Sequence, residues 1–113
     1  MPIPNAERAV IEPAKLHSYL LSRNHPIGRF KAAFFLALGY SSENWRQLEA
    51  ALRSQHLSQD ATAEAPTPYG QKYAIRATLV GPSGNAAELV SVWVVRKGEE
   101  FPRFVTAYPE GNR

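Results

Sequence analysis

The spacing of apolar residues changes once along this chain, and that change limits the fold more than any other feature. Before residue 58, apolar residues recur every three or four positions, as they do on the buried face of a helix. After residue 68 they alternate with polar residues, which is typical of half-buried strands. The segment between, residues 58–68 (SQDATAEAPTP), is polar and holds two prolines, so it predicts a connecting loop. We therefore expect an α+β fold, with three N-terminal helices followed by an antiparallel sheet of three to four strands.

Residues 12–57 are expected to form the helical half. The first helix should begin at Pro13, since proline is favoured at the first helical position, and end before His25-Pro26. The second is expected over residues 29–38. Ser41 or Ser42 can cap the third, which should fray near residues 54–57. The apolar stripes expected to face the core are Leu16, Tyr19 and Leu20, then Phe30, Ala33, Phe34, Ala37 and Leu38, then Trp45, Leu48 and Leu52.

Residues 69–109 carry the alternating pattern of a sheet. Tyr73, Ile75, Ala77 and Leu79 fall on one face of a first strand. Turn residues at 81–85 and 97–100 separate it from strands expected over residues 88–96 and 101–108. Residues 1–11 hold two prolines and little pattern, and they are expected to form a loose arm. Because neither half is long enough to fold alone, we expect one domain over residues 1–113.

Composition excludes several classes of protein. The chain has no cysteine, which removes a disulfide framework, a thiolate metal site and a cysteine nucleophile. Its three histidines are scattered and offer little for a stable zinc site, so neither a metal nor a cofactor is expected. No apolar run approaches the roughly 20 residues of a membrane helix, and the first residues lack the apolar core of a signal peptide. A cytoplasmic protein that does not enter a membrane is the expectation.

The charges are segregated although the net charge is only +3. Residues 13–42 contain no acidic residue, and neither do residues 65–87, which carry Lys72 and Arg76. If the two stretches meet in the fold, they create a positive field that favours an anionic ligand. The alternative is that a short sequence shows such gaps by chance.

Two groups of residues could bind or cleave a phosphodiester. His25 lies in the break before the second helix, whose free backbone N–H groups suit a phosphate, and Arg29 and Lys31 add charge there. Thr106 and Tyr108, expected on one face of the last strand with Phe104, could hydrogen-bond a phosphate and stack on a base. The alternatives are a turn with solvated cations in the first case and ordinary strand formers in the second.

From the residues alone, no binding or catalytic role is expected for Trp93, Ser91 and the other two histidines. Trp93 and Ser91 share a face of the preceding strand, where Trp93 is expected in the core. His17 is expected at the surface of the first helix. His56, near the end of the third, is given no role.

Several runs resemble a family of short uncharacterised bacterial domains. They are residues 14–21 (AKLHSYLL), 25–32 (HPIGRFKA), 35–40 (FLALGY), 69–73 (YGQKY), 81–84 (GPSG), 91–93 (SVW) and 102–109 (PRFVTAYP), so the resemblance covers about residues 5–109. Related domains end larger toxin-like or phage proteins. More distantly, the helices before a sheet and the residue types present are similar to those of the ribonuclease toxins grouped as barnase, EndoU, colicin and RelE-like, which cut RNA without a metal.

This second resemblance implies a metal-independent ribonuclease-like toxin domain that acts on RNA phosphodiesters. The residues it singles out are His25, Lys31, Thr106 and Tyr108 as catalytic groups, and Arg29, Lys15 and Lys72 as phosphate-binding groups. A version with two histidines would need His17 beside His25. The alternative function is a non-catalytic interaction module, of a toxin–antitoxin or phage-related kind, that binds a small protein encoded by a neighbouring gene.

Overall fold

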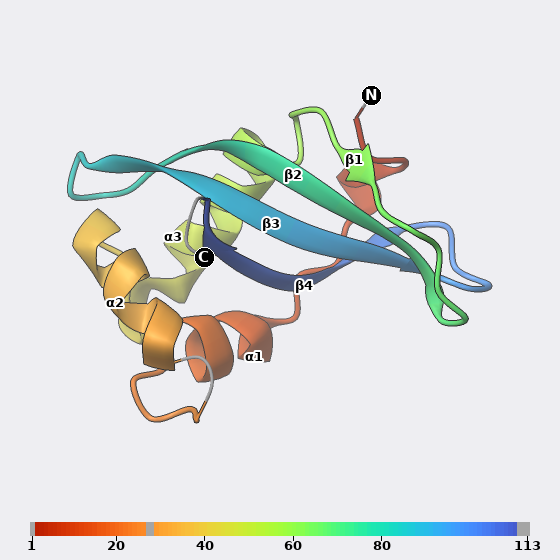
Figure 1. Ribbon diagram of the computed structural model, residues 1–113. Coiled ribbons are helices and arrows are strands. Elements are labelled where there is room, and N and C mark those ends of the chain that lie inside the picture. Colours follow the sequence, from red (N-terminus) through yellow and green to blue (C-terminus); the bar gives the residue numbers. More distant parts are fainter. Residues whose placement is uncertain (1, 27–28, 111–113) are drawn as a thin grey trace.

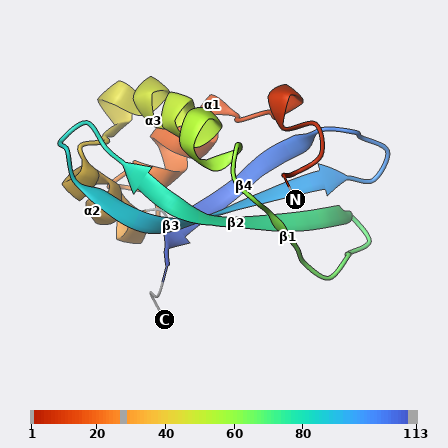
Figure 2. The same ribbon diagram turned by 90° about the horizontal axis from the view of Figure 1, so that it is seen from above.

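A computed structural model describes residues 2–26 and 29–110, and for Arg29 and Phe30 it describes the backbone alone. In chain order the elements are η1 (Ala6–Arg8), α1 (Pro13–Lys15), η2 (Leu16–Leu20), α2 (Arg29–Leu38), η3 (Ser42–Asn44), α3 (Trp45–Ala51), η4 (Leu52–His56), β1 (Thr62–Ala63), β2 (Gly70–Val80), β3 (Ala86–Arg96) and β4 (Pro102–Pro109). The helices lie on one face of a twisted sheet, and no helix of the described part covers the other face (Figures 1 and 2).

The sheet is an antiparallel meander in the order β1-β2-β3-β4. The long hairpin of β2 and β3 pairs Gly70 with Arg96 at one end and Val80 with Ala86 at the other. β1 covers only a short part of the β2 edge, opposite Tyr73 and Ala74. β4 forms the opposite edge of the sheet, and Val10 of the N-terminal segment forms a bridge to its outer side at Arg103.

The core lies between the helices and the sheet. Trp93, Ile75, Leu79 and Leu89 fill the sheet side and are fully buried. The helical side is filled by Leu16, Leu20, Phe35, Leu38, Leu48 and Leu52. Tyr73 and Ala77 pack against the same cluster, so the alternation predicted for the first long strand is confirmed. Trp93 is in the core, as expected.

The expected fold of three complete helices before the sheet is wrong in its helical part. α1 is a three-residue piece that continues as the π-helical segment η2, where the backbone N–H of Leu21 donates to the oxygen of Leu16 at 2.9 Å. α3 likewise passes into the π-helical η4, and Leu57 N–H donates to Leu52 oxygen. These wider turns keep Leu20 and Leu57 buried, so packing decides the local hydrogen-bond pattern. The sheet that follows has four strands.

The buried face of α2 also differs from the predicted stripe. α2 has the expected bounds, Arg29–Leu38. Ala32, Phe35 and Leu38 are buried, whereas Ala33 and Ala37 are exposed and Phe34 is half-buried. A helix with apolar residues on two adjoining stripes can bury either stripe by rotating about its axis. Packing against the sheet selects the rotation that buries Phe35.

The N-terminal segment is not a loose arm. Ile3, Ala9 and Ile11 are buried in the core. Val10 bonds the edge of β4, because its N–H donates to Pro102 oxygen and its own oxygen accepts from Phe104 N–H, both at 2.9 Å. The expected loop of residues 58–68 likewise contains the two-residue strand β1.

Candidate functional site

A groove of about 510 Å³ lies where the first helical segments meet β4. Its polar lining comes from Lys15, Ser18 and Tyr19 on α1 and η2, from His25 in the following segment, and from Thr106 on β4. Ala14 and Val105 complete the walls. The groove is therefore lined mainly by groups that bind or transfer protons, and it joins parts of the chain more than 80 residues apart.

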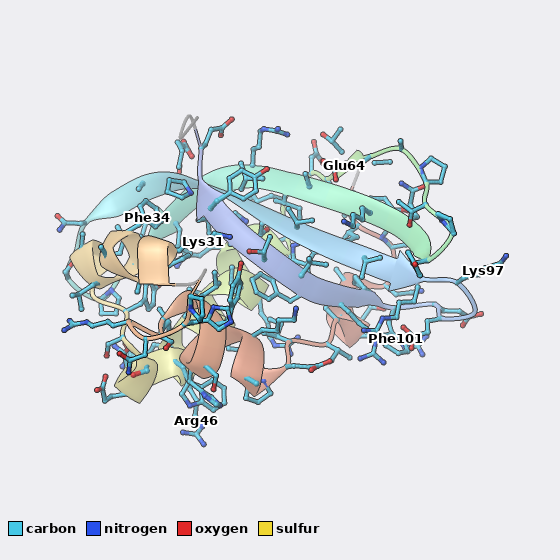
Figure 3. All side chains as sticks on the ribbon, turned by 60° about the horizontal axis from the view of Figure 1, so that its bottom comes forward. Lys31, Phe34, Arg46, Glu64, Lys97 and Phe101 are labelled. Carbon is cyan, nitrogen blue, oxygen red and sulfur yellow. The ribbon has the colours of Figure 1, made fainter. Side chains whose placement is uncertain are left out.

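Lys31 connects both sides of this groove. Its Nζ donates to the Tyr19 hydroxyl at 3.0 Å and to Thr106 Oγ1 at 2.9 Å. The Tyr19 hydroxyl and Thr106 Oγ1 are themselves 3.3 Å apart. The side chain of Lys31 thus extends from α2 toward the edge strand β4 (Figure 3). Three polar groups, one each from η2, α2 and β4, form a closed triangle of contacts.

His25 contacts this triangle through the ring of Tyr19. The two rings meet edge to face, with their centroids 5.0 Å apart. The backbone N–H of His25 donates to Ser22 Oγ, which turns the chain after η2. His25 lies in the break that the sequence predicts before α2, and this position brings it to the groove.

The surroundings of Tyr19 favour its ionised form. Partial burial acts to raise the pKa of its phenol. The hydrogen bonds from Lys31 and Thr106, with the charges of Lys31 and Lys15, act in the other direction and together outweigh burial. The pKa of Tyr19 is therefore below its ordinary value, and the negative charge of a phenolate would be stabilised here.

The other predicted residues fall at different places. Lys15 lines the groove with His25 and Thr106. Tyr108 is two residues beyond Thr106 on β4, a step of roughly 7 Å, and packs beside Val90 and Val92 on the sheet face opposite the helices. Lys72 is on β2, two strands away from β4, and does not line the groove. The side chain of Arg29 and residues 27–28 lie outside the described residues.

A bulge in β4 changes which side chains share a face. Val92 pairs with Thr106 whereas Trp93 pairs with Phe104, so Val105 is an extra residue between them. Phe104 consequently enters the core, where its ring meets that of Trp93 at 5.2 Å. The prediction that Phe104 shares a face with Thr106 and Tyr108 is wrong, because strict alternation fails at a bulge.

The two acid-free stretches do not combine. Lys15 lines the groove and Lys31 contacts two of its lining residues, and both lysines belong to the first stretch. In the second, Arg76 forms an ion pair with Glu110 at 3.2 Å. The positive character of the groove therefore comes from the helical half of the chain.

His17 does not join His25. It lines a separate groove of about 430 Å³, with Arg23 and Glu43, on the other side of η2. Its ring packs against Trp45, with centroids 5.6 Å apart. A site that uses both histidines is not formed.

Two residues were missed by sequence reasoning. Tyr19 was assigned to the core stripe of the first helix, yet it lines the groove and its hydroxyl bonds Lys31 and Thr106. His56 was given no role, but it is fully buried, with Nδ1 at 2.8 Å from Ser91 Oγ and Nε2 at 3.2 Å from Ala77 oxygen. An aromatic residue with a hydroxyl on a short helix was the available signal for Tyr19.

Residues 2–26 and 29–110 contain no group of three or more histidine or acidic side chains arranged to hold a metal ion. In the same part of the chain, none of the helices combines the length and the apolar composition needed to cross a membrane.

Comparison with known proteins gives a family and a fold. A family model described as a domain of unknown function (DUF6883) matches residues 2–111, so the chain belongs to that family. No curated protein matches it. Among solved structures, the chain is similar to one from a contact-dependent growth inhibition toxin–immunity protein complex of Klebsiella pneumoniae 342, with a TM-score of 0.60 and 19% identity over 95% of this chain and 97% of that chain. That likeness shows a shared fold. The resemblance to ribonuclease toxins stays a prediction.

Proposed function

We propose that this member of the DUF6883 family is a metal-independent ribonuclease-like toxin domain that cleaves RNA phosphodiesters in the groove between η2 and β4. The observation that carries the proposal is the contact of Lys31 Nζ with both the Tyr19 hydroxyl and Thr106 Oγ1. That contact presents an ammonium and two hydroxyls at the groove that His25 and Lys15 also line. These are the groups needed to bind a phosphate and to move a proton without a metal ion.

The reaction uses the nucleophile that RNA supplies. The 2′-hydroxyl attacks the adjacent phosphorus, which restricts cleavage to RNA. Negative charge then builds on the phosphate oxygens, and Lys31, Lys15 and the Thr106 hydroxyl stabilise it. His25 moves a proton, because an imidazole can both accept and donate one within hydrogen-bond reach of the reacting groups.

The fold comparison supports a role of the toxin–immunity kind and fits both a toxin and an immunity protein. The similar chain is part of a toxin–immunity protein complex, and the alignment covers nearly all of both chains. A toxin role for this chain is consistent with that fold and with the basic groove.

The first experiment incubates the purified protein with total RNA in EDTA. Wild type should cleave RNA, and His25→Ala should lose about 10²–10⁴-fold in rate, as expected for removal of a general acid or base. His17→Ala is the matched control, because His17 lines the other groove, and it should cleave like wild type. Absence of cleavage by wild type, or equal cleavage by His25→Ala, would contradict the proposal.

A second candidate function is a protein-binding module of the toxin–immunity kind. It is favoured by the same fold comparison, because both components of a toxin–immunity protein complex bind a protein partner. The partner would be a small protein encoded by a neighbouring gene, and the chain would have no catalytic role.

The two functions make opposite predictions for His25. A binding module should form a stable complex with the purified neighbouring protein and should not cleave RNA. The His25→Ala variant should form the same complex. Size-exclusion chromatography of the two purified proteins, together with the RNA assay, separates the alternatives.

A further inference from the structure

Cleavage of RNA by its own 2′-hydroxyl needs two proton transfers. One removes the proton of the attacking hydroxyl, and the other protonates the leaving 5′-oxygen. Among the described residues, His25 is the single histidine that lines the groove, since His17 lines another and His56 is buried in the core. A second proton-transfer group must therefore be of another residue type.

We propose that Tyr19 is this second group and that it acts as the general acid, while His25 acts as the general base. The inference rests on the proposed ribonuclease function and adds a catalytic residue to it. Tyr19 is half-buried, it lines the groove, and its ring packs against that of His25. The two candidate groups are therefore neighbours on the wall of one groove.

The hydrogen bonds of Tyr19 suit a group that gives up a proton. Lys31 Nζ has only protons to donate, so the Tyr19 oxygen accepts from it at 3.0 Å and keeps its own proton available. The remaining contact, to Thr106 Oγ1, is the longest of the three at 3.3 Å. The contact with Lys31 therefore does not use the phenol proton, which can be donated to a ligand oxygen in the groove.

The phenolate that results is stabilised where it forms. The ammonium of Lys31 already contacts the phenol oxygen, and Thr106 Oγ1 can turn its proton toward it. Lys15 adds a second positive charge close enough to lower the pKa of Tyr19.

The O–H bond of the 2′-hydroxyl breaks and its proton passes to a ring nitrogen of His25, while the bond from O2′ to phosphorus forms. The bond from phosphorus to O5′ breaks, its electron pair stays on O5′, and O5′ takes the proton of the Tyr19 hydroxyl. The products are a 2′,3′-cyclic phosphate and a 5′-hydroxyl. Return of one proton from the imidazolium to the phenolate through solvent restores the site.

Two substrates with different leaving groups test the assignment. One is a dinucleotide, whose 5′-alkoxide leaves poorly without protonation. The other is a nucleoside 3′-(4-nitrophenyl phosphate), whose nitrophenolate leaves without an acid. Tyr19→Phe should lose about 10²–10⁴-fold in kcat/KM on the dinucleotide and less than about threefold on the nitrophenyl ester. His25→Ala should lose activity on both, because both need the 2′-hydroxyl to be deprotonated.

The controls keep the outcomes separate. Tyr69→Phe makes the same chemical change at a tyrosine that is 82% exposed and outside the groove, and it should behave as wild type. A thermal melt of Tyr19→Phe checks folding, which the retained ring favours. Equal losses of Tyr19→Phe on both substrates would show that Tyr19 only positions Lys31, and no loss on the dinucleotide would show no role; either overturns the assignment. If the wild-type protein cleaves neither substrate, the proposed function itself is contradicted.

Discussion

Two polar clusters join the helices to the sheet in this protein, and they use similar residues in opposite ways. The groove cluster consists of Tyr19, His25, Lys31 and Thr106, is partly exposed, and includes a charged ammonium. The buried cluster consists of His56, Ser91 and Trp93, all fully inaccessible to solvent. Each has a histidine, an aromatic ring and a strand hydroxyl.

The buried cluster forms a chain of hydrogen bonds that is already satisfied. Trp93 Nε1–H donates to Ser91 Oγ at 2.9 Å, and the Ser91 hydroxyl then donates to His56 Nδ1. Because Ala77 oxygen only accepts, His56 Nε2 carries the proton, which gives a neutral imidazole. Every group has its partner, and water does not reach it. The same residue types therefore serve stability in one place and are available for a ligand in the other, and solvent access makes the difference.

Among the substitutions that compare the two clusters, the largest effect is expected at Lys31, the charged member that the buried cluster lacks. Lys31→Met keeps most of the side-chain volume but removes the ammonium, and RNA cleavage should fall by about 10²–10³-fold, as for loss of one group that stabilises transition-state charge. Initial rates with a defined RNA measure this. Lys97→Met changes an exposed lysine in the turn after β3 and should leave the rate unchanged. Comparable losses in both variants would remove the special role of the groove cluster.

The buried cluster should respond in stability and not in chemistry. Ser91→Ala leaves His56 Nδ1 and Trp93 Nε1 buried without their partner, and it should lower the free energy of unfolding by about 2–3 kcal/mol. Urea unfolding measures the change. The rate of RNA cleavage by the folded variant should stay within about threefold of wild type. Ser58→Ala, at an exposed serine, is the control and should change stability by less than about 0.5 kcal/mol. A large loss of activity without a loss of stability would break the comparison.

A smaller effect is expected from acid. Burial lowers the pKa of His56, and it outweighs the hydrogen bond to Ala77 oxygen and the carboxylate of Glu88, which both act to raise it. The unfolded chain, with a histidine pKa of about 6.5, therefore binds a proton that the folded chain resists. The stabilising contribution of neutral His56 is complete above about pH 6.5 and is lost as the pH falls below that value.

Urea midpoints at about pH 7.5 and about pH 5.5 test this dependence. The midpoint of wild type should be lower at the acidic pH. His56→Gln removes the titrating group and should flatten the dependence, whereas His17→Ala should keep it. An unchanged slope in His56→Gln would show that another group controls the acid response.

The smallest effect is expected at Lys72. It is a cation of the second acid-free stretch but lies on β2, two strands from the groove. Solvent and salt screen a charge at that separation, so Lys72→Ala should reduce RNA cleavage by less than about threefold. The matched substitution Lys15→Ala, at the groove, should reduce it more. Equal effects would mean that RNA extends across the open face of the sheet.

Much of the fold could be predicted from local pattern. The change of period placed the helices before the strands, and the bounds of α2 and the inward face of β2 agree with the pattern because each depends on nearby residues. The helical detail could not be predicted. The π-helical turns η2 and η4 and the rotation of α2 depend on how Leu20, Leu57 and Phe35 pack against a sheet that comes later in the chain.

The candidate site shows the same division. His25 and Lys31 were identified because a break, a helix start and an acid-free stretch are local features. Tyr19 was not, since its position on an apolar stripe concealed that its hydroxyl reaches Lys31 and Thr106. Phe104 was assigned to the wrong face because nothing in the local pattern signals the bulge at Val105.

The sequence by itself determined which residue types are available: no cysteine, few histidines, and cations gathered in a stretch without acids. It also determined the order of helices and strands, because hydrophobic period is a local property. Only the tertiary structure decided which of these residues meet. It put Lys31 against Thr106, 75 residues away, left Lys72 outside the groove, and buried His56 while leaving His25 at the groove. Contacts over such separations, and the solvent access that gives each histidine its role, are set by how the helices pack on the sheet.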